Sequence, residues 1–289
     1  MQRWTEAMRA GRYADAWTIE RANIAARSPA TRDDPTLPYH RRWVWDGRTP
    51  DGRDVLVRCY HGLGDTIQFA RYLPVLASRA RALTLEVQPR LIPLLRGLFA
   101  GAIHPFHSAN PLPPRECDVE ITELPCALSV PPEVVSAPYL SWPAASLPAG
   151  TIGLCHAAGE WDHARSVPER LLAPLCAEHP CVTLVAGATT LPVLNPAGCP
   201  FDMAETAALV AGCDLVVTVD TMIAHLAGAL GRPTWLLLKN EPDWRWDPSR
   251  RTSAWYPTLR QYLQPRVGAW PSVVDAVMAE FATERGVAA

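Results

Sequence analysis

Residues 54–79, DVLVRCYHGLGDTIQFARYLPVLASR, decide the fold class of this chain. The aliphatic run at 55–57 predicts a buried strand, and Gly62 and Gly64 predict a tight turn where a ligand can approach the backbone closely. Thr66 is expected to cap the helix that follows. The free N–H groups of that helix would lie at the carboxyl edge of a sheet, where open α/β proteins bind their ligands.

The same order of strand, turn and helix recurs along the chain. Further strands are predicted at 83–88 and 117–122, and a second series at 151–157, 181–187, 214–220 and 233–238. Helical stretches separate them, which is typical of a parallel sheet covered by helices. The proline-rich stretch 131–150 has no clear period and predicts a boundary between two α/β halves.

The predicted organisation has four parts. Residues 1–30 are expected to form short helices broken near Gly11, and residues 40–140 and 150–268 are expected to form the two α/β domains. Residues 270–285 carry valines on one face, which predicts an amphipathic helix that packs at the domain junction.

Composition narrows the class of protein. The 289 residues are 48% hydrophobic and 19% charged with a net charge of -2, which gives no basis for a nucleic-acid or membrane partner. No apolar run is long enough for a transmembrane segment, and the N-terminus lacks the apolar core of a signal peptide, so a cytoplasmic protein is expected. The eight cysteines show no zinc-ligand spacing, which favours buried, reduced thiols and no metal site.

Two clusters of polar residues follow predicted strands. Asp65 in the glycine-containing turn is either a general base or a charge that complements the helix dipole. Asp220 ends a later strand, and Thr221 and His225 share one face of the next helix. This second cluster predicts a diphosphate cradle at a helix start, with a capped helix and a buried histidine as the alternative.

Three segments together carry a family resemblance. HGLGDTIQFARYLP (61–74), DTMIAHLAGALGRPTWLLL (220–238) and PDWRWDPSRRTSAWYPTLR (242–260) resemble the heptosyltransferase-like, family 9 type glycosyltransferases, especially the domain often found behind tetratricopeptide repeats. The likeness covers about residues 40–270. It implies an α/β fold of the GT-B type, in which two Rossmann-like domains face each other across a cleft. The N-terminal one would bind the acceptor and the C-terminal one a nucleotide-sugar donor, with no metal or other cofactor.

The resemblance also implies roles for individual residues. Asp65 would deprotonate the acceptor hydroxyl. The residues expected to bind the donor or its phosphates are Gly62, Gly64, Arg165, Asp220, Thr221, Met222 and His225. Met222 stands where relatives commonly have glycine, and the lysine that relatives place near the start of the second domain is absent. Arg165 is the best substitute, and its alternative role is an ion pair with Asp162.

The segment 242–260 is unusually aromatic for a connector. Trp244 and Trp246 are candidates for stacking on a base or sugar ring, and the alternative is a small satellite core that fixes the long loop. Gln68 and His61 are further candidates for acceptor binding.

The resulting hypothesis is a metal-independent glycosyltransferase that moves a sugar, for which the relatives suggest a heptose, from a nucleotide-diphosphate sugar to a hydroxyl. The acceptor could be a saccharide, a lipid-linked glycan or a protein. One alternative is a non-catalytic module on a degenerate fold whose N-terminal helices dock a protein partner. The other is a nucleotide-sugar epimerase.

Overall fold

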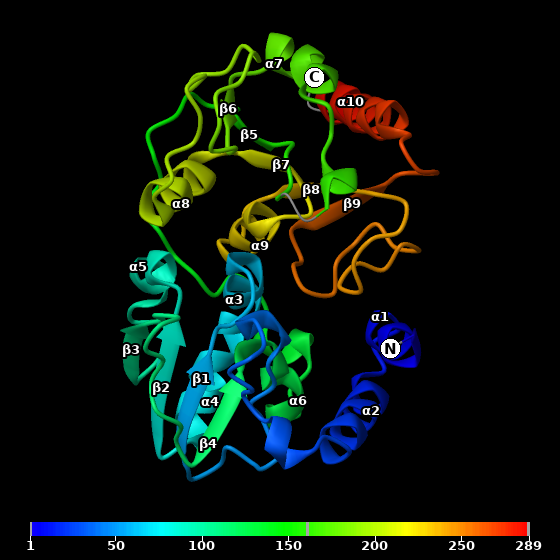
Figure 1. Cartoon of the computed structure of the whole chain (residues 1–289). Coiled ribbons are helices and arrows are strands. Elements are labelled where there is room, and N and C mark those ends of the chain that lie inside the picture. The colour runs from blue at the N-terminus through cyan, green and yellow to red at the C-terminus, as the bar shows by residue number, and fades with distance from the viewer. Residues whose placement is uncertain (1, 160–161, 288–289) are drawn as a thin grey trace. The chain divides into compact units, whose positions relative to one another are not determined.

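The chain folds into two compact units, unit 1 (Met1–Leu140) and unit 2 (Ser141–Ala289), in a computed structural model that describes residues 2–159 and 162–287. Each unit contains a parallel β-sheet with helices packed against it (Figure 1). This architecture confirms the predicted α/β class with two Rossmann-like sheets.

Unit 1 contains a four-stranded sheet in the order β3-β2-β1-β4. Its pairs are parallel, and Val57 in β1 lies opposite Leu85 and Val119. The strands are β1 (Asp54–Arg58), β2 (Ala82–Val87), β3 (Ala102–Pro105) and β4 (Cys117–Glu120). The helices are α1 (Gln2–Arg9), α2 (Tyr13–Ala25), α3 (Leu63–Phe69), α4 (Leu73–Arg79), α5 (Ile92–Leu95) and α6 (Leu124–Leu128).

The two N-terminal helices form a hairpin within unit 1. Gly11 has φ of +70° between α1 and α2, a conformation that glycine adopts without strain, and this confirms the predicted break. The hairpin is joined to α6, because the Arg21 guanidinium donates to the carbonyl oxygen of Cys126 at 2.9 Å.

Unit 2 contains a five-stranded parallel sheet in the order β6-β5-β7-β8-β9. Val217 in β7 lies opposite Leu154 and Trp235, so all three central strands place large apolar residues in the middle of the sheet. The strands are β5 (Ile152–Cys155), β6 (Cys181–Thr183), β7 (Leu215–Val219), β8 (Thr234–Leu238) and β9 (Leu259–Leu263). The helices are α7 (Ala173–Glu178), α8 (Met203–Gly212), α9 (Met222–Ala229) and α10 (Trp270–Val287).

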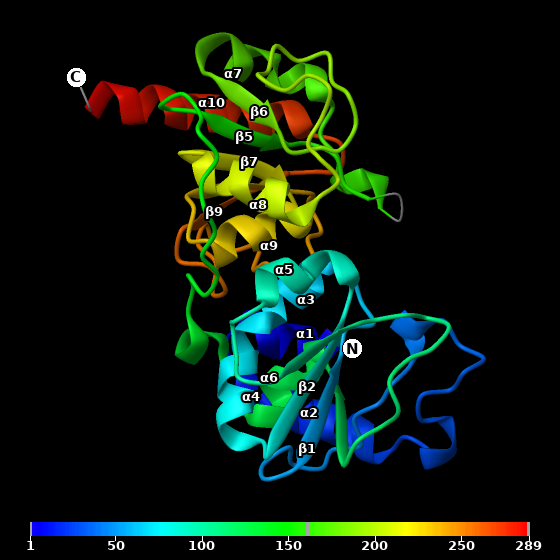
Figure 2. The same ribbon diagram turned by 90° about the vertical axis from the view of Figure 1, so that its left-hand side faces the viewer.

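Helices cover both faces of the unit 2 sheet. Figures 1 and 2 show α7 and α10 on one side of the strands and α8 and α9 on the other. The core on the α7 and α10 side includes Leu154, Val217, Val273 and Val277, each at most 2% exposed. Because successive strand residues point to opposite faces, burial on both sides explains why these strands read as continuous apolar runs.

In both sheets the strand order reverses next to the first strand. In unit 1 the chain moves from β1 outward to β2 and β3 and then returns to β4 on the other side of β1. In unit 2 it moves from β5 to β6 and returns to β7. Such a reversal opens a crevice at the carboxyl ends of the two central strands, which is where ligands bind in open α/β sheets.

The helix predicted after HGLGD begins earlier than expected and is interrupted. It consists of α3, a 3-10 turn at Ala70–Tyr72 and α4, which has a proline in its first turn. The residue that caps α3 is Gly62, and Thr66 instead donates from its hydroxyl to Gln88 Oε1 at 3.0 Å. The expectation that Thr66 caps this helix is therefore wrong, because a helix that starts at Leu63 already contains Thr66.

Two strands were not predicted. β3 and β9 lie at the edges of their sheets, and β3 has the sequence AIHP with mostly exposed residues. β9 has the sequence LRQYL, in which polar residues interrupt the apolar pattern. Edge strands need only one buried face or none, so their hydrophobic signal is weak.

The structure also bears on the expectations for the cysteines and for membrane-spanning helices. All eight cysteines are buried and free, as predicted. None of the helices in the described ranges combines the length and apolar character needed to cross a bilayer.

Candidate functional site

The carboxyl edge of the unit 2 sheet gathers most of the residues predicted to bind a donor. β5, β7 and β8 end here, and the residues that follow them directly are His156, Asp220 and Lys239. Next to the reversal in strand order, the ends of β5 and β7 are in contact, because Cys155 Sγ lies 3.6 Å from Thr221 Oγ1. The sequence-predicted cluster therefore lies at the switch point of this sheet.

Thr221 caps α9, as in the capped-helix alternative to the predicted diphosphate cradle. Its backbone is extended, and its hydroxyl accepts a hydrogen bond from the Ile223 N–H at 3.3 Å. Met222 is the first residue of the helix and is half-buried. A helix start can bring backbone N–H groups to an anion. Here the Ile223 N–H is bonded to the Thr221 hydroxyl and the Ala224 N–H to the Thr221 carbonyl oxygen.

Arg165 joins the loop after β5 to this helix start. Its Nη1 donates to the carbonyl oxygen of Asp220 at 2.7 Å, and its Nε lies 3.7 Å from Asp162 Oδ2. Its side chain is only 12% exposed. Both roles considered from the sequence thus have a physical basis, because the guanidinium pairs with Asp162 and also reaches the predicted phosphate cluster.

Asp220 is a buried carboxyl group next to this arginine. Burial, together with the neighbouring Asp243 carboxylate, raises the pKa of Asp220 above its ordinary value, while Arg165 and Arg245 partly oppose the shift. A carboxyl group with a raised pKa in a crevice is characteristic of functional sites as well as of buried ion networks.

His225 is buried and hydrogen bonded inside the unit. It is 5% exposed, its Nδ1 lies 3.0 Å from the Tyr256 hydroxyl, and its ring stacks on Trp246 with centroids 5.7 Å apart. This arrangement is the capped helix with a buried histidine that the sequence left open as an alternative. In this structure His225 joins the first turns of α9 to Tyr256 and Trp246.

Most of the aromatic segment forms a satellite core. Trp246 and Tyr256 are 0% exposed and Trp255 is 3% exposed, so the Trp246 ring cannot stack on a ligand as expected. Trp244 is half-buried, and the Arg245 guanidinium lies over its ring at 4.6 Å from the centroid. Of the two predicted stacking residues, Trp244 alone retains an accessible ring.

The carboxyl edge of the unit 1 sheet holds the candidate base. Asp65, the third residue of α3, accepts a hydrogen bond from the backbone N–H of the N-cap residue Gly62 at 3.0 Å. Gly62 has φ of -70°, so its conformation does not require glycine, but a Cβ there would lie 3.3 Å from Asp65 Oδ2. Gly64 lies within the first turn of α3. Asp65 therefore complements the helix start, and it lies at the switch point between β1 and β4.

His61 and Glu120 form a pair at the same edge. His61 Nδ1 lies 3.0 Å from Glu120 Oε1, and the histidine side chain is 36% exposed whereas Glu120 is 3% exposed. Glu120 was not among the predicted site residues, because the strand was expected to continue to residue 122 whereas β4 ends at Glu120. Gln68 is 0% exposed, so the expectation that its side chain contacts an acceptor is wrong.

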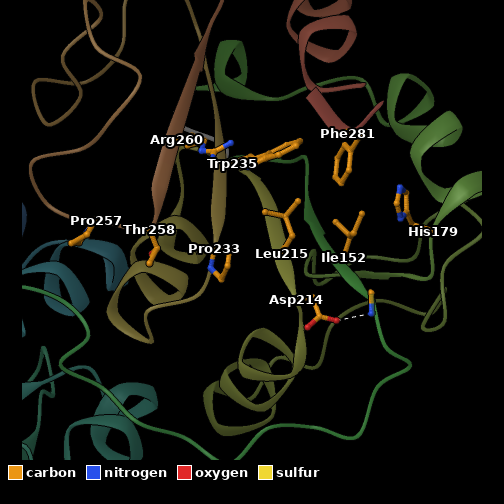
Figure 3. A pocket seen from close by; sticks show the side chains of 11 residues that line it. Ile152, His179, Asp214, Leu215, Pro233, Trp235, Pro257, Thr258, Arg260 and Phe281 are labelled. Carbon is orange, nitrogen blue, oxygen red and sulfur yellow. Dashed lines mark hydrogen bonds between the residues drawn. The ribbon is translucent and has the colours of Figure 1, made fainter. Parts of the chain in front are cut away.

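A pocket of about 530 Å³ lies at the opposite, amino edge of the unit 2 sheet (Figure 3). The first residues of the strands line it together with Phe281 of α10, and Asp214, another lining residue, accepts a hydrogen bond from the Gly150 N–H at 2.6 Å. Because open α/β sheets bind ligands at the carboxyl ends of their strands, we do not assign the donor to this pocket.

The sequence of residues 179–255 matches the model of glycosyltransferase family 9 (heptosyltransferase). This segment resembles family 9. The match includes the start of α9 and the segment that follows β8, and it confirms the predicted resemblance to family 9 for these residues, whereas the motif at 61–74 lies outside it. Arg165 and Asp65 lie outside the matched residues. A comparison with curated protein sequences finds no match.

The fold is similar to that of solved glycosyltransferases. The iron-containing dodecameric glycosyltransferase TibC from enterotoxigenic E. coli H10407 superposes with a TM-score of 0.53 at 13% identity, covering 66% of this chain and 59% of that chain. A family 9 glycosyltransferase from Veillonella parvula gives 0.50 at 13% identity, covering 75% and 87%. E. coli heptosyltransferase WaaC with ADP gives 0.50 at 14% identity, covering 80% and 98%. The chain therefore has the fold of these proteins and spans about three fifths of the length of TibC.

Iron is named for TibC alone among these three. Among the residues that the structure describes here, no group of three or more His, Cys, Asp or Glu side chains is arranged to hold a metal ion.

Proposed function

We propose that this chain transfers a sugar from a nucleotide-diphosphate sugar to a hydroxyl acceptor. The observation that carries the proposal is the cluster at the switch point of unit 2, where Arg165 hydrogen bonds to Asp220 next to the capped start of α9. Part of this cluster lies in the segment that resembles family 9. Cations and a helix N-terminus are the groups that bind phosphates without a metal.

The donor would bind in unit 2. Arg165 and the first-turn N–H groups of α9 would contact the diphosphate, and Met222 would limit the space beside it. His225 would act by holding Tyr256 and the helix in place, since it is buried. Of the two side chains predicted to stack on the base or the sugar ring, Trp246 is buried, so Trp244 is the remaining candidate.

The acceptor would bind in unit 1, with Asp65 as general base. In the transfer step the acceptor oxygen forms a bond to the anomeric carbon and its proton moves to the Asp65 carboxylate. The bond between the anomeric carbon and the phosphate oxygen breaks, and its electron pair leaves with the nucleoside diphosphate. Arg165 and the helix start would stabilise the charge that develops on this leaving group.

We propose that this reaction needs no metal, because the positive charge at the donor site comes from the protein. A heptose as the sugar and adenine as the base are proposed from the relatives, since family 9 is described as heptosyltransferase and WaaC was solved with ADP.

A second candidate is a non-catalytic nucleotide-binding or partner-binding module. Met222 at the helix start and the buried His225 favour it, because both reduce the polar surface available to a donor. In this case the hairpin of α1 and α2 would dock a protein partner.

The test is an assay of the full chain with a panel of nucleotide-diphosphate sugars, each with and without hydroxyl acceptors and with and without a chelator. Donor consumption that requires an acceptor and persists with the chelator supports the proposed transferase. Conversion of the donor without an acceptor would instead reveal an epimerase. Nucleotide binding with no turnover on any acceptor would favour the binding module.

A further inference from the structure

Lys239 is the only lysine in the chain, although lysine and arginine together number 27. It follows β8 directly, so it lies at the carboxyl edge of the unit 2 sheet. Its Nζ lies 2.8 Å from Asp162 Oδ2, and its side chain is 28% exposed. This single ammonium group is therefore placed at the candidate donor site.

Lys239 and Arg165 share one carboxylate. Asp162 Oδ2 lies 2.8 Å from Lys239 Nζ and 3.7 Å from Arg165 Nε, and Arg165 in turn donates to the Asp220 carbonyl oxygen. The Lys239 ammonium, followed by Arg165, holds the pKa of Asp162 below its ordinary value. Two cations are thus gathered beside the start of α9 around one acidic side chain.

A purely structural role explains this cluster less well. Partly exposed ion pairs contribute only about 0–1 kcal/mol to stability, because solvent screens them and both side chains lose conformational freedom. Phosphate recognition gives a clearer reason for a compact ammonium group with three donors at this point. Arginine fills every other basic position of the chain, including the surface ion pairs.

We infer that Lys239 is a phosphate-binding residue of the donor site, which acts with Arg165 on the diphosphate of the nucleotide. Asp162 holds the two cations in position, and the phosphates of the ligand displace it from them. This inference rests on the proposed function, because it assumes that unit 2 binds a nucleoside diphosphate. Lys239, directly after β8, would then take the role of the lysine that the sequence lacks near the start of unit 2.

The test uses the fact that the chain has a single lysine. An amine-reactive acetylating reagent modifies only Lys239 and the N-terminal amine, and peptide mass spectrometry measures both rates in the full-length protein. We expect saturating ADP, and inorganic pyrophosphate as the minimal probe, to slow acetylation of Lys239 at least about fivefold. The rate at the N-terminal amine should not change and serves as the internal control.

Calorimetric titration of the same sample separates the possible failures. If ADP binds but the acetylation rate of Lys239 is unchanged, the inference is overturned and the proposed function stands. If neither ADP, any other nucleoside diphosphate nor pyrophosphate binds, both are overturned.

Substitutions test the role of Lys239 through the affinity for ADP and pyrophosphate. Lys239→Ala is expected to weaken ADP and pyrophosphate binding by about tenfold or more, as for loss of a charge-assisted hydrogen bond, whereas Lys239→Arg should stay within about threefold. Asp162→Asn retains a side-chain oxygen that can accept the Ala164 N–H, and it is expected to tighten pyrophosphate binding because the competing charge is gone. Lower thermal stability in both variants with unchanged affinity would show that the pair is structural.

Arg260→Ala is the matched control. It also removes one positive charge from unit 2, but Arg260 lines the pocket at the amino edge of the sheet and pairs with Glu280 (Figure 3). We expect its ADP affinity to equal that of the unmodified chain. An equal loss in Arg260→Ala and Lys239→Ala would mean that net charge, and not contact with phosphate, causes the effect, and would overturn the inference.

Discussion

Asp65 combines a structural and a proposed chemical role in one carboxylate. One of its oxygens accepts the Gly62 N–H at the start of α3. A substitution by alanine would therefore remove this hydrogen bond together with the base, at a cost of about 0.5–1.5 kcal/mol in stability. The informative change keeps the hydrogen-bond acceptor and removes only the basicity.

Asp65→Asn is accordingly the residue-scale prediction for catalysis. We expect sugar transfer to fall by about 10²–10⁴-fold, the usual contribution of general-base catalysis, with nucleotide affinity within a few fold. Initial rates and calorimetry on the same protein measure the two quantities. Turnover equal to that of the unmodified chain would remove Asp65 as the base.

Glu123 predicts a pH dependence of stability. It is largely buried beside Glu120, and burial followed by that neighbouring charge raises the pKa of Glu123 to about 8. A carboxyl group whose pKa is raised in the folded state stabilises the fold below its unfolded pKa, near 4.5, and loses that contribution as the pH rises through about 8.

Glu123→Gln should remove this dependence. Between pH 5 and pH 9 the unmodified chain is expected to lose at least about 1 kcal/mol more unfolding free energy than the variant. Denaturant titrations at a series of pH values compare the two. Parallel pH profiles for the two proteins would show that Glu123 is not protonated in the folded chain at neutral pH.

At the scale of elements, α9 packs against the aromatic segment through a glycine. A Cβ added to Gly228 would lie 2.3 Å from the Tyr256 ring, and the same tyrosine bonds to His225. The helix can approach the satellite core only because this position lacks a side chain.

Gly228→Ala is therefore expected to destabilise the protein by about 1–3 kcal/mol through overpacking, and to weaken nucleotide binding by displacing the start of α9. Gly187→Ala is the control, because a Cβ there meets nothing within 4 Å. Thermal unfolding of both variants measures the difference. Equal stability of the two would mean that α9 and Tyr256 adjust without cost.

The elements that were predicted from the sequence are those with a local signal. The strand before Asp220 and the helix after Thr221 could be read directly, because an apolar run is followed by a residue type that caps helices. The contact between Lys239 and Asp162 joins residues 77 positions apart, and no local pattern reports it. The burial of Trp246 likewise depends on how the long loop folds back. The sequence therefore could not show whether this side chain stacks on a ligand or packs in the satellite core.

In the whole molecule, the donor is proposed to bind unit 2 and the acceptor unit 1. Saturating ADP is expected to slow hydrogen exchange at the start of α9 and in the segment after β8. Exchange in strands β1, β2 and β4 should not change. Mass spectrometry of peptides from the full chain measures this, and protection spread evenly over both units would contradict the assignment.

The central claim is that unit 2 recognises a nucleoside diphosphate through protein cations, without a metal. The most direct test is calorimetric titration of the full chain with ADP, UDP, GDP and dTDP and with AMP, UMP, GMP and dTMP, in magnesium and in a chelator. We expect one diphosphate to bind equally well in both buffers and more tightly than its own monophosphate. Binding of none of them, or of AMP as tightly as ADP, would contradict it.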